Sequence, residues 1–538
     1  MPLSASQALL LAGAVAPAGA QLWNKTIQTT YGPVQGFKYF DQSTLETYFN
    51  ISSSNVTAFL GIPYGADTAY ENRWKPALPP PKWNTTLKAT SFGPQCPTST
   101  KPYGDGVVSE DCLSLNVWTN AASADARLPV MLWNQGSEEA SNNTWWYGGG
   151  MALKDVILIT FNRRDDAFGY LAHPDLNAEG YEQFGHETSG NYGVLDQLAV
   201  LKWIKANIAN FGGDPDRVTI AGQSFGSSQV YHAVNSELFS GYFHGAISES
   251  GIRWPHDTML AGLATSYLTM KDAIDFGINY TTYNNVTSVA ELRKLPMEQL
   301  VQYSGDRVTN CSIDWITALN ADYPLIFKPV LDGYVLPKKY IDSLIDGPAN
   351  DVPVITGNTL DESGASTSTN YTLAEFEYYN QLKYGSLYDN FTELYPTNGN
   401  DTLANQQWNL AATDVNIVAT GSTPQPGQSQ GAFHQSEIMY ALNALYANVD
   451  TYPFTSVDYE IQAKMSAYWA NFAKTLDPNR GGSYVGRGVN GTLPRWSPND
   501  ANGTQFVFEL GDSFGNIPIA KPGHVEFVEA FFARQAAY

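Results

Sequence analysis

Cysteine, histidine and basic residues are scarce in this chain. Only three of its 538 residues are cysteine and seven are histidine, while 30 Lys and Arg residues stand against 52 Asp and Glu residues. A net charge of −22 repels phosphate backbones, so we expect no nucleic-acid partner. His, Cys and Asp residues with metal-ligand spacing are missing too, and we therefore expect no metal and no cofactor.

Long hydrophobic runs are also lacking, since spanning a bilayer takes ~20 apolar residues. We therefore expect no membrane span. The apolar run Ala8 to Ala16 is shorter than that, and the small residues Ala18, Gly19 and Ala20 follow it. This pattern is typical of a secretory signal peptide, so we expect residues 1–20 to be removed and the protein to be secreted.

The sequence is rich in acceptor sites for N-linked glycans. One N-x-S/T sequon arises easily by chance, but thirteen beside a signal peptide predict a glycosylated surface. The thirteen acceptors are Asn24, Asn50, Asn55, Asn84, Asn142, Asn279, Asn285, Asn310, Asn370, Asn390, Asn400, Asn490 and Asn502.

Three cysteines in an oxidising compartment allow one disulfide and leave one thiol. Cys96 and Cys112 are close in sequence and would close a short loop, so we expect them to pair. Cys311 is then predicted to be free, buried and inert.

Apolar runs alternate with amphipathic stretches in the first half of the chain. We expect strands at 155–162, 216–224, 245–250 and 352–358, and helices at 191–211 and from 225 to 235. This order predicts an α/β fold with a mostly parallel sheet covered by helices on both faces. Residues 21–538 are interpreted as one domain, in which helical insertions near 254–340 and 366–430 cap the sheet.

The segment Gly222-Gln223-Ser224-Phe225-Gly226 lies between a predicted strand and a predicted helix. Small residues at both ends permit a sharp turn that exposes a serine hydroxyl above the sheet edge, beside a helix N-terminus. A bare GxSxG motif is weak evidence, but this context makes Ser224 a candidate nucleophile.

A nucleophilic serine needs a base and an acid, which α/β-hydrolases place after it in the order acid, histidine. His434 follows Ser224 at sufficient distance to leave room for an acid-bearing strand. It would take the serine proton and return it to the leaving group. The strand at 352–358 leads to Asp361 and Glu362, and position alone does not separate these two acids.

Several longer motifs make a family resemblance specific. They are FGGDPDRVTIAGQSFG (211–226), EDCLSLNV (110–117), FLGIPYG (59–65), SGNYGVLDQ (189–197) and AFHQSE (432–437). Over nearly the whole mature chain, the sequence resembles the type-B carboxylesterase and cholinesterase-like lipase family of α/β-hydrolases, especially its secreted fungal members.

The resemblance implies a function for individual residues. It implies that Glu362 is the acid of a Ser224–His434–Glu362 triad, that Glu437 is a buried structural glutamate, and that Cys112 pairs with Cys96. In this family the activity is hydrolysis of carboxylic esters without a cofactor.

The turn after the strand that ends at Trp133 departs from the family pattern. The family has a glycine-rich turn there whose backbone N–H groups bind the oxyanion, whereas this chain reads Asn-Gln-Gly-Ser-Glu-Glu and is two residues short. We expect Gly136, Ser137 and Phe225 to form the oxyanion and substrate-binding site. An ungapped alignment places Ser137 and Glu138 on the donor glycines, and the Phe225 N–H is the remaining donor. Ser and Glu do not readily adopt the positive φ that glycine permits.

Further departures lie close to the predicted site. Gln223 replaces a glutamate, and Phe225 replaces a small residue and is expected to fill part of the acyl pocket or to support the turn. Arg163, Asp165 and Asp166 replace aromatic, aliphatic and glycine residues. We interpret these three as a surface salt-bridge set; the alternative is that they changed together with the shortened turn and remade one side of the pocket. The glycines of 141–150 are interpreted as a loop leading into the next segment.

Three functions fit these observations. The first is a secreted serine esterase acting on small-molecule carboxylic esters that are uncharged or moderately apolar. The second keeps the triad but performs acyl transfer, lactonisation, elimination or cyclisation, because the oxyanion turn is altered. The third is a non-catalytic binding protein, which the presence of all three triad residues disfavours.

Overall fold

The computed structural model describes residues 21–100, 102–263, 265–305, 327–360, 362, 371–420, 432–499, 506–511 and 513–538. The predicted signal peptide, Cys311 and Asp361 lie outside these residues, as do the sequons at Asn310, Asn370 and Asn502.

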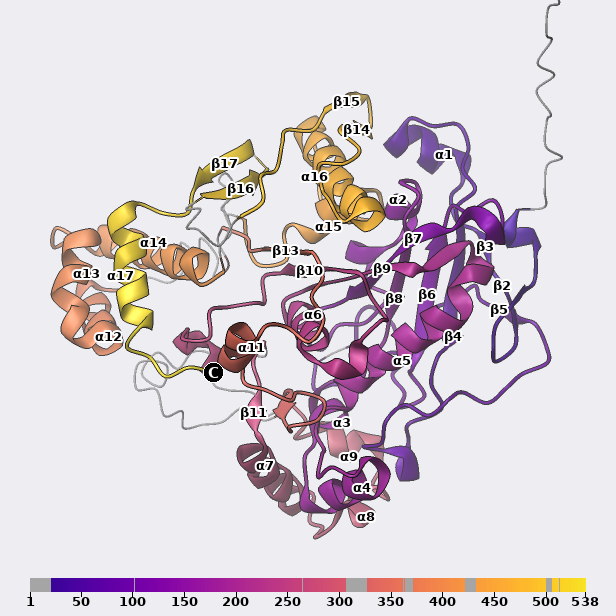
Figure 1. Ribbon diagram of the computed structural model, residues 1–538, viewed down its shortest axis with the longest axis horizontal. Coiled ribbons are helices and arrows are strands. Elements are labelled where there is room, and N and C mark those ends of the chain that lie inside the picture. Colours follow the sequence, from indigo (N-terminus) through magenta and orange to yellow (C-terminus); the bar gives the residue numbers. More distant parts are fainter. Residues whose placement is uncertain are drawn as a thin grey trace, which may run out of the picture.

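An eight-stranded sheet forms the centre of the molecule (Figure 1). Its strands, in spatial order, are β13 (Val354–Gly357), β10 (Gly245–Glu249), β9 (Gly213–Gln223), β7 (Leu128–Asn134), β8 (Ile157–Phe161), β6 (Ser114–Thr119), β4 (Thr57–Pro63) and β3 (Phe37–Lys38). The four pairings from β13 to β8 are parallel and the three from β8 to β3 are antiparallel. The predicted strands are confirmed, and the sheet is mixed, with the GxSxG motif in its parallel half.

Helices cover both faces of this sheet, as the sequence predicts. The described residues as a whole, the sheet-covering layers and the rest together, contain the helices α1 (Gln42–Thr44), α2 (Gly149–Ala152), α3 (Asp166–Tyr170), α4 (Pro174–Phe184), α5 (Tyr192–Asn207), α6 (Phe225–Asn235), α7 (Met270–Tyr283), α8 (Val289–Leu292), α9 (Met297–Val301), α11 (Tyr340–Asp346), α12 (Leu373–Tyr384), α13 (Tyr388–Leu394), α14 (Asp401–Thr420), α15 (Ile438–Ala441), α16 (Ser456–Thr475) and α17 (Pro522–Phe532). Figure 1 shows α16 on one side of the sheet and α5 and α6 on the other.

The side-chain alternation of β7 explains this layering. Val130 and Leu132 belong to the apolar cluster that includes residues of α5 and α6, whereas Met131 and Trp133 belong to the cluster that includes residues of α16. Successive side chains of a strand point to opposite faces, so a strand that is apolar throughout is buried on both.

Smaller sheets lie outside the central one. They comprise β1 (Ile27–Gln28), β2 (Pro33–Gln35) and β5 (Leu87–Lys88); β11 (Leu268–Thr269) with β12 (Val330–Leu331); β14 (Ser483–Gly486) with β15 (Val489–Thr492); and β16 (Phe506–Leu510) with β17 (Phe514–Pro518).

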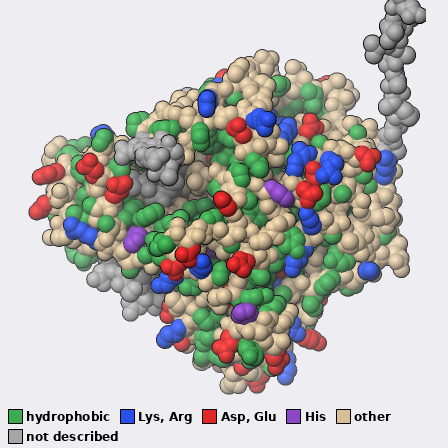
Figure 2. All heavy atoms as spheres, viewed as in Figure 1, with side chains coloured by type: hydrophobic (Ala, Val, Ile, Leu, Met, Phe, Trp, Pro, Cys, Tyr) green, Lys and Arg blue, Asp and Glu red, His purple; other side chains and the backbone are tan. Residues whose placement is uncertain are grey.

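The second predicted insertion, residues 366–430, is helical in its described part. Its helices α12, α13 and α14 pack with α17 around a separate aromatic core that includes Phe376, Phe391, Tyr395 and Phe527. In Figure 1 these helices form a lobe beside the central sheet. Figure 2 shows acidic side chains both on this lobe and on the main body.

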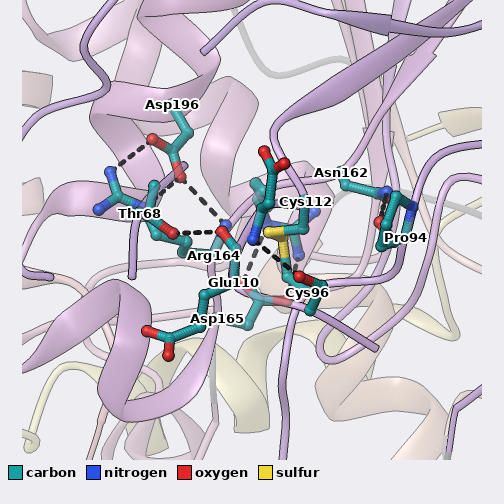
Figure 3. The surroundings of a disulfide bond; sticks show 12 residues. Thr68, Pro94, Cys96, Glu110, Cys112, Asn162, Arg164, Asp165 and Asp196 are labelled. Atoms are coloured by element: carbon teal, nitrogen blue, oxygen red, sulfur yellow. Dashed lines mark hydrogen bonds and ion pairs between the residues drawn. A yellow bond between two sulfur atoms is a disulfide. The ribbon is translucent and has the colours of Figure 1, made fainter. Parts of the chain in front are cut away.

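The disulfide between Cys96 and Cys112 is present, with a Cα–Cα distance of 5.1 Å (Figure 3). Two hydrogen bonds tie this part of the chain to the segment after β8: Asn162 Nδ2 donates to the Pro94 carbonyl at 2.7 Å, and the Ser99 N–H donates to Asp166 Oδ2 at 2.8 Å. The disulfide loop therefore supports the segment in which the sequence departs from the family pattern.

The expectations from sequence included the absence of a membrane span and a glycosylated surface. In the part of the chain that the structure describes, no helix combines the length and apolar character that crossing a bilayer requires. Of the ten sequons in the described ranges, eight have an exposed asparagine: Asn24, Asn50, Asn84, Asn279, Asn285, Asn390, Asn400 and Asn490.

Candidate active site

Ser224 lies on a sharp turn between β9 and α6. Its φ of 57° and ψ of −123° are a conformation that L-residues rarely adopt, and its N–H donates to the Glu249 carbonyl at 2.9 Å. The glycines of the motif make the turn possible: a Cβ on Gly226 would lie 1.9 Å from the Asn134 carbonyl oxygen. The close approach of β7 to α6 places the turn after β7 against Ser224.

His434 and Glu362 come together although 72 residues separate them. His434 Nδ1 is hydrogen-bonded to Glu362 Oε2, and the Thr359 N–H donates to Glu362 Oε1 at 2.8 Å. Burial opposes the charge of Glu362, but its bond to His434 holds the pKa of the carboxyl below its ordinary value. Burial also disfavours the charged form of His434, which by itself would lower the pKa of the imidazole. The hydrogen bond to Glu362 and the charge of that carboxylate outweigh burial, so the pKa of His434 is raised.

Gln223 connects the histidine to the serine turn. Its amide Nε2 lies 3.2 Å from His434 Nε2 and 3.4 Å from Nδ1, and its side chain is fully buried. Since Gln223 directly precedes Ser224, the imidazole lies beside the serine turn. The structure thus brings Glu362, His434 and the Ser224 turn to one edge of the sheet.

Two further buried carboxyl groups, those of Glu249 and Glu437, lie close to this site. Glu249 pairs with Gln223 in the sheet register, and its Oε1 accepts the indole N–H of Trp469 at 2.7 Å. Burial raises the pKa of Glu249 to about 8. Burial and the neighbouring Glu249 also raise the pKa of Glu437 well above its ordinary value. Glu437 was expected to be a buried structural glutamate, whereas nothing in the sequence pattern singled out Glu249.

The turn after β7 has a positive φ at one position where the family has a glycine. Glu138, one of the two residues aligned on the donor glycines, has a φ of +59°. Its N–H donates to Asp165 Oδ2 at 2.9 Å, while the Gly136 N–H donates to Glu139 Oε2 at 2.8 Å. Two amides of this turn are therefore already hydrogen-bonded to carboxylates.

A buried ion pair holds the turn in place. Arg163 contacts Asp165 at 3.0 Å and donates to the carbonyl oxygens of Gln135 at 2.9 Å and Gly136 at 2.6 Å. Both charged side chains are nearly inaccessible, at 0% and 4% exposure. The interpretation of this segment as a surface salt-bridge set is wrong, because its charges are buried and bonded to the altered turn.

Asp166 occupies the position of a family glycine and keeps a positive φ of 49°. Burial raises its pKa well above the ordinary value, and the nearby Glu138 charge adds to this effect. The neighbouring Arg164 forms a separate buried pair with Asp196, at 2.6 Å. The whole segment 163–166 is thus part of the protein interior.

Phe225, the residue after Ser224, packs against Arg163 and Tyr170. Its ring is 2% exposed, lies 5.0 Å from the Arg163 guanidinium carbon and packs edge-on against Tyr170, with ring centroids 5.6 Å apart. Its backbone N–H is at the first position of α6, where no helical carbonyl can accept it.

The glycines of 141–150 are not a simple loop. Gly149 and Gly150 begin the short helix α2, and a Cβ on Gly150 would lie 1.9 Å from the Asn443 carbonyl oxygen. Close packing therefore explains these glycines, and the turn after β7 does not include them.

A cavity of about 1290 Å³ lies near the site, lined by Glu249, Ser250, Thr359, Glu437 and aromatic residues such as Trp469. Ser224, Glu362 and His434 do not line it. Across the described residues, no group of three or more His, Cys, Asp and Glu side chains is arranged to hold a metal ion.

The sequence matches the family described as the carboxylesterase family over residues 24–414 and 415–515. Fumonisin B1 esterase of Sphingopyxis macrogoltabida is 29% identical over 461 residues, covering 79% of this chain and 80% of that protein. Carboxylesterase 1D of Rattus norvegicus is 26% identical over 565 residues, covering 92% of both.

Solved esterase structures share the fold. A carboxylesterase of Geobacillus stearothermophilus superimposes with a TM-score of 0.68 at 24% identity, covering 94% of this chain and 99% of that one. At this identity the likeness concerns the α/β-hydrolase fold.

Proposed function

Because this chain belongs to the carboxylesterase family and is a carboxylic ester hydrolase, we propose that it cleaves esters through an acyl-enzyme on Ser224. The observation that carries this proposal is the hydrogen bond between His434 and Glu362 beside the serine turn. That pair provides a base, oriented by a carboxylate, next to a strained serine.

The proposed reaction has two halves. Ser224 Oγ attacks the ester carbonyl while His434 takes its proton, and the histidine then protonates the departing alkoxide. Water, deprotonated by His434, releases the acid and regenerates the serine. Glu362 keeps the Nδ1–H tautomer and stabilises the imidazolium that forms in each half.

Charge also develops on the carbonyl oxygen and needs donors. The N–H of Phe225 is available at the start of α6, and the dipole of this helix favours negative charge there. The Ser137 N–H is the second proposed donor. The Gly136 N–H, which we also expected to contribute, is bonded to Glu139.

We further propose that the protein is secreted and glycosylated and that its substrates are small, uncharged or moderately apolar esters. The exposed sequon asparagines support glycosylation.

A fluorophosphonate probe tests the proposal, since it reacts with an activated serine. We expect labelling of the wild type and none of Ser224→Ala, together with turnover of p-nitrophenyl esters that this substitution abolishes. Absence of labelling would instead favour a non-catalytic binding protein.

The altered turn favours acyl transfer or another non-hydrolytic reaction as a second candidate. It would be supported by probe labelling without ester turnover. Ser224-dependent turnover in water would exclude it.

A further inference from the structure

The side chain of Glu139 folds back over the turn after β7. Its Oε2 accepts the Gly136 N–H at 2.8 Å, and its Oε1 accepts the amide of Gln435 at 3.1 Å. Gln435 directly follows His434 in the chain. The Glu139 carboxyl therefore bridges the altered turn and the loop that bears the proposed base.

The Glu139 carboxyl is an anion bound to a backbone N–H beside the serine turn, since a Cβ on Gly226 would lie 2.6 Å from the carbonyl oxygen of Gln135, the residue before Gly136. Donors of an oxyanion hole lie 2.7–3.1 Å from the charged oxygen, and Glu139 Oε2 is at such a distance from the Gly136 nitrogen. One N–H group makes one strong hydrogen bond, so Gly136 does not serve a substrate while Glu139 holds it. The turn already binds an anion from its own chain.

The surroundings of Glu139 both favour and oppose its charge. Burial raises its pKa, while the two hydrogen bonds and the positive charges of Arg163 and His434 oppose this increase. A carboxylate that leaves these donors without finding others becomes a buried, unpaired charge, which is strongly unfavourable. Displacement is therefore easiest for a substrate that offers the carboxylate a new donor.

We propose that Glu139 is a specificity-determining residue that occupies the oxyanion position of the turn, and that esters bind productively by displacing it from Gly136. The favoured esters carry a hydroxyl or ammonium group beside the scissile carbonyl, which the displaced carboxylate then accepts. This inference rests on the proposed Ser224 chemistry.

Labelling kinetics with a fluorophosphonate test the proposal, because phosphonylation of Ser224 also places an oxygen in the oxyanion hole. Glu139→Ala frees the Gly136 N–H, and we expect its second-order labelling rate to rise about 10- to 100-fold, since one oxyanion donor is typically worth about 100- to 1000-fold. Glu139→Gln retains a weaker acceptor, and we expect a smaller rise.

Glu375→Ala is a matched control. Glu375 likewise accepts the backbone N–H three residues before it, Thr372 at 2.9 Å, but it lies at the exposed start of α12. We expect its labelling rate to equal that of the wild type. Thermal unfolding of each variant shows whether it is folded, and Glu139→Gln carries the test should Glu139→Ala fail to fold.

Substrate preference provides a second measurement. Methyl lactate and methyl propionate differ by one hydroxyl beside the carbonyl. We expect the wild type to prefer the lactate ester in kcat/KM, and Glu139→Ala to lose this preference.

The proposed role of Glu139 and the proposed Ser224 chemistry can fail separately. Labelling of Glu139→Ala at or below the wild-type rate, or an unchanged ester preference, overturns the role of Glu139 alone. Absence of Ser224-dependent labelling in every variant overturns the proposed function and this inference with it.

Discussion

The guanidinium of Arg163 donates to the carbonyl oxygen of Gly136 at 2.6 Å, from a position where it has no exposure to solvent. The same side chain forms an ion pair with Asp165, which in turn accepts the Glu138 N–H. The shortened turn and the charged segment after β8 are therefore one structural unit. This supports the alternative that they changed together.

Removing Arg163 is expected to destabilise the protein strongly. Arg163→Met leaves Asp165 buried without its cation, and breaking a buried pair in this way typically costs about 3–5 kcal/mol of unfolding free energy. Adding Asp165→Asn removes the stranded charge while retaining an acceptor for Glu138, so the double variant should recover part of the loss.

Chemical denaturation measures these differences. Lys271→Met is the control, since Lys271 pairs with Asp275 on an exposed helix face and should leave the unfolding free energy nearly unchanged. Equal losses in Arg163→Met and Lys271→Met would contradict the buried role of Arg163.

We expect the acidic limb of the pH profile of kcat/KM to shift when Gln223 is replaced by glutamate. His434 must be neutral to act as base, and its pKa is raised mainly by Glu362, so kcat/KM should fall as the pH drops through this raised value. Gln223→Glu places a second carboxylate 3.2 Å from the imidazole, where it favours the imidazolium. The limb should therefore move to higher pH.

Gln381→Glu adds the same charge on the exposed face of α12 and controls for net charge. Its profile should coincide with that of the wild type. If the acidic limb of Gln223→Glu moved to lower pH, this would contradict the position of His434 beside residue 223.

Gly226 is expected to tolerate no side chain. A Cβ there would lie 1.9 Å from the backbone oxygen of Asn134, the last residue of β7, which pairs with Gly222 of β9 just before the serine turn. Overpacking typically costs about 1–3 kcal/mol, and a backbone clash leaves little room for relief. Gly226→Ala should lower the melting temperature and Ser224 labelling, whereas Gly515→Ala, in open space, should alter neither.

The disulfide should stabilise the charged segment as well as its own loop. The two cysteines are 16 residues apart, and closing a loop of this length is worth about 3 kcal/mol in the chain-entropy view. We expect the double variant Cys96→Ser, Cys112→Ser to melt at a lower temperature. An unchanged melting temperature would show that the hydrogen bonds of Asn162 and Asp166 are sufficient.

The sequence predicts most of the fold because local patterns determine it. The helix after Ser224 ends at Asn235 as expected, and the strands of the parallel half are continuous apolar runs bounded by turn residues. Family motifs also lead to Glu362 rather than Asp361.

The altered turn was harder to predict because its stability comes from distant partners. Charges at Arg163 and Asp165 normally indicate a solvated surface, and only their contacts with residues 27 and 28 positions earlier make burial favourable. The fold of Glu139 onto Gly136 depends on Gln435, almost 300 residues away in the chain. No local pattern reports such contacts.

The central claim is that the Ser224 hydroxyl carries the acyl group. Rapid acid quenching during turnover of p-nitrophenyl acetate, followed by peptide mass spectrometry, measures this directly. We predict an acetyl group on the peptide that contains Ser224, and its accumulation in Glu362→Gln if that variant slows deacylation. Ester turnover at the wild-type rate by Ser224→Ala, or an acetyl group on another residue only, would contradict the account.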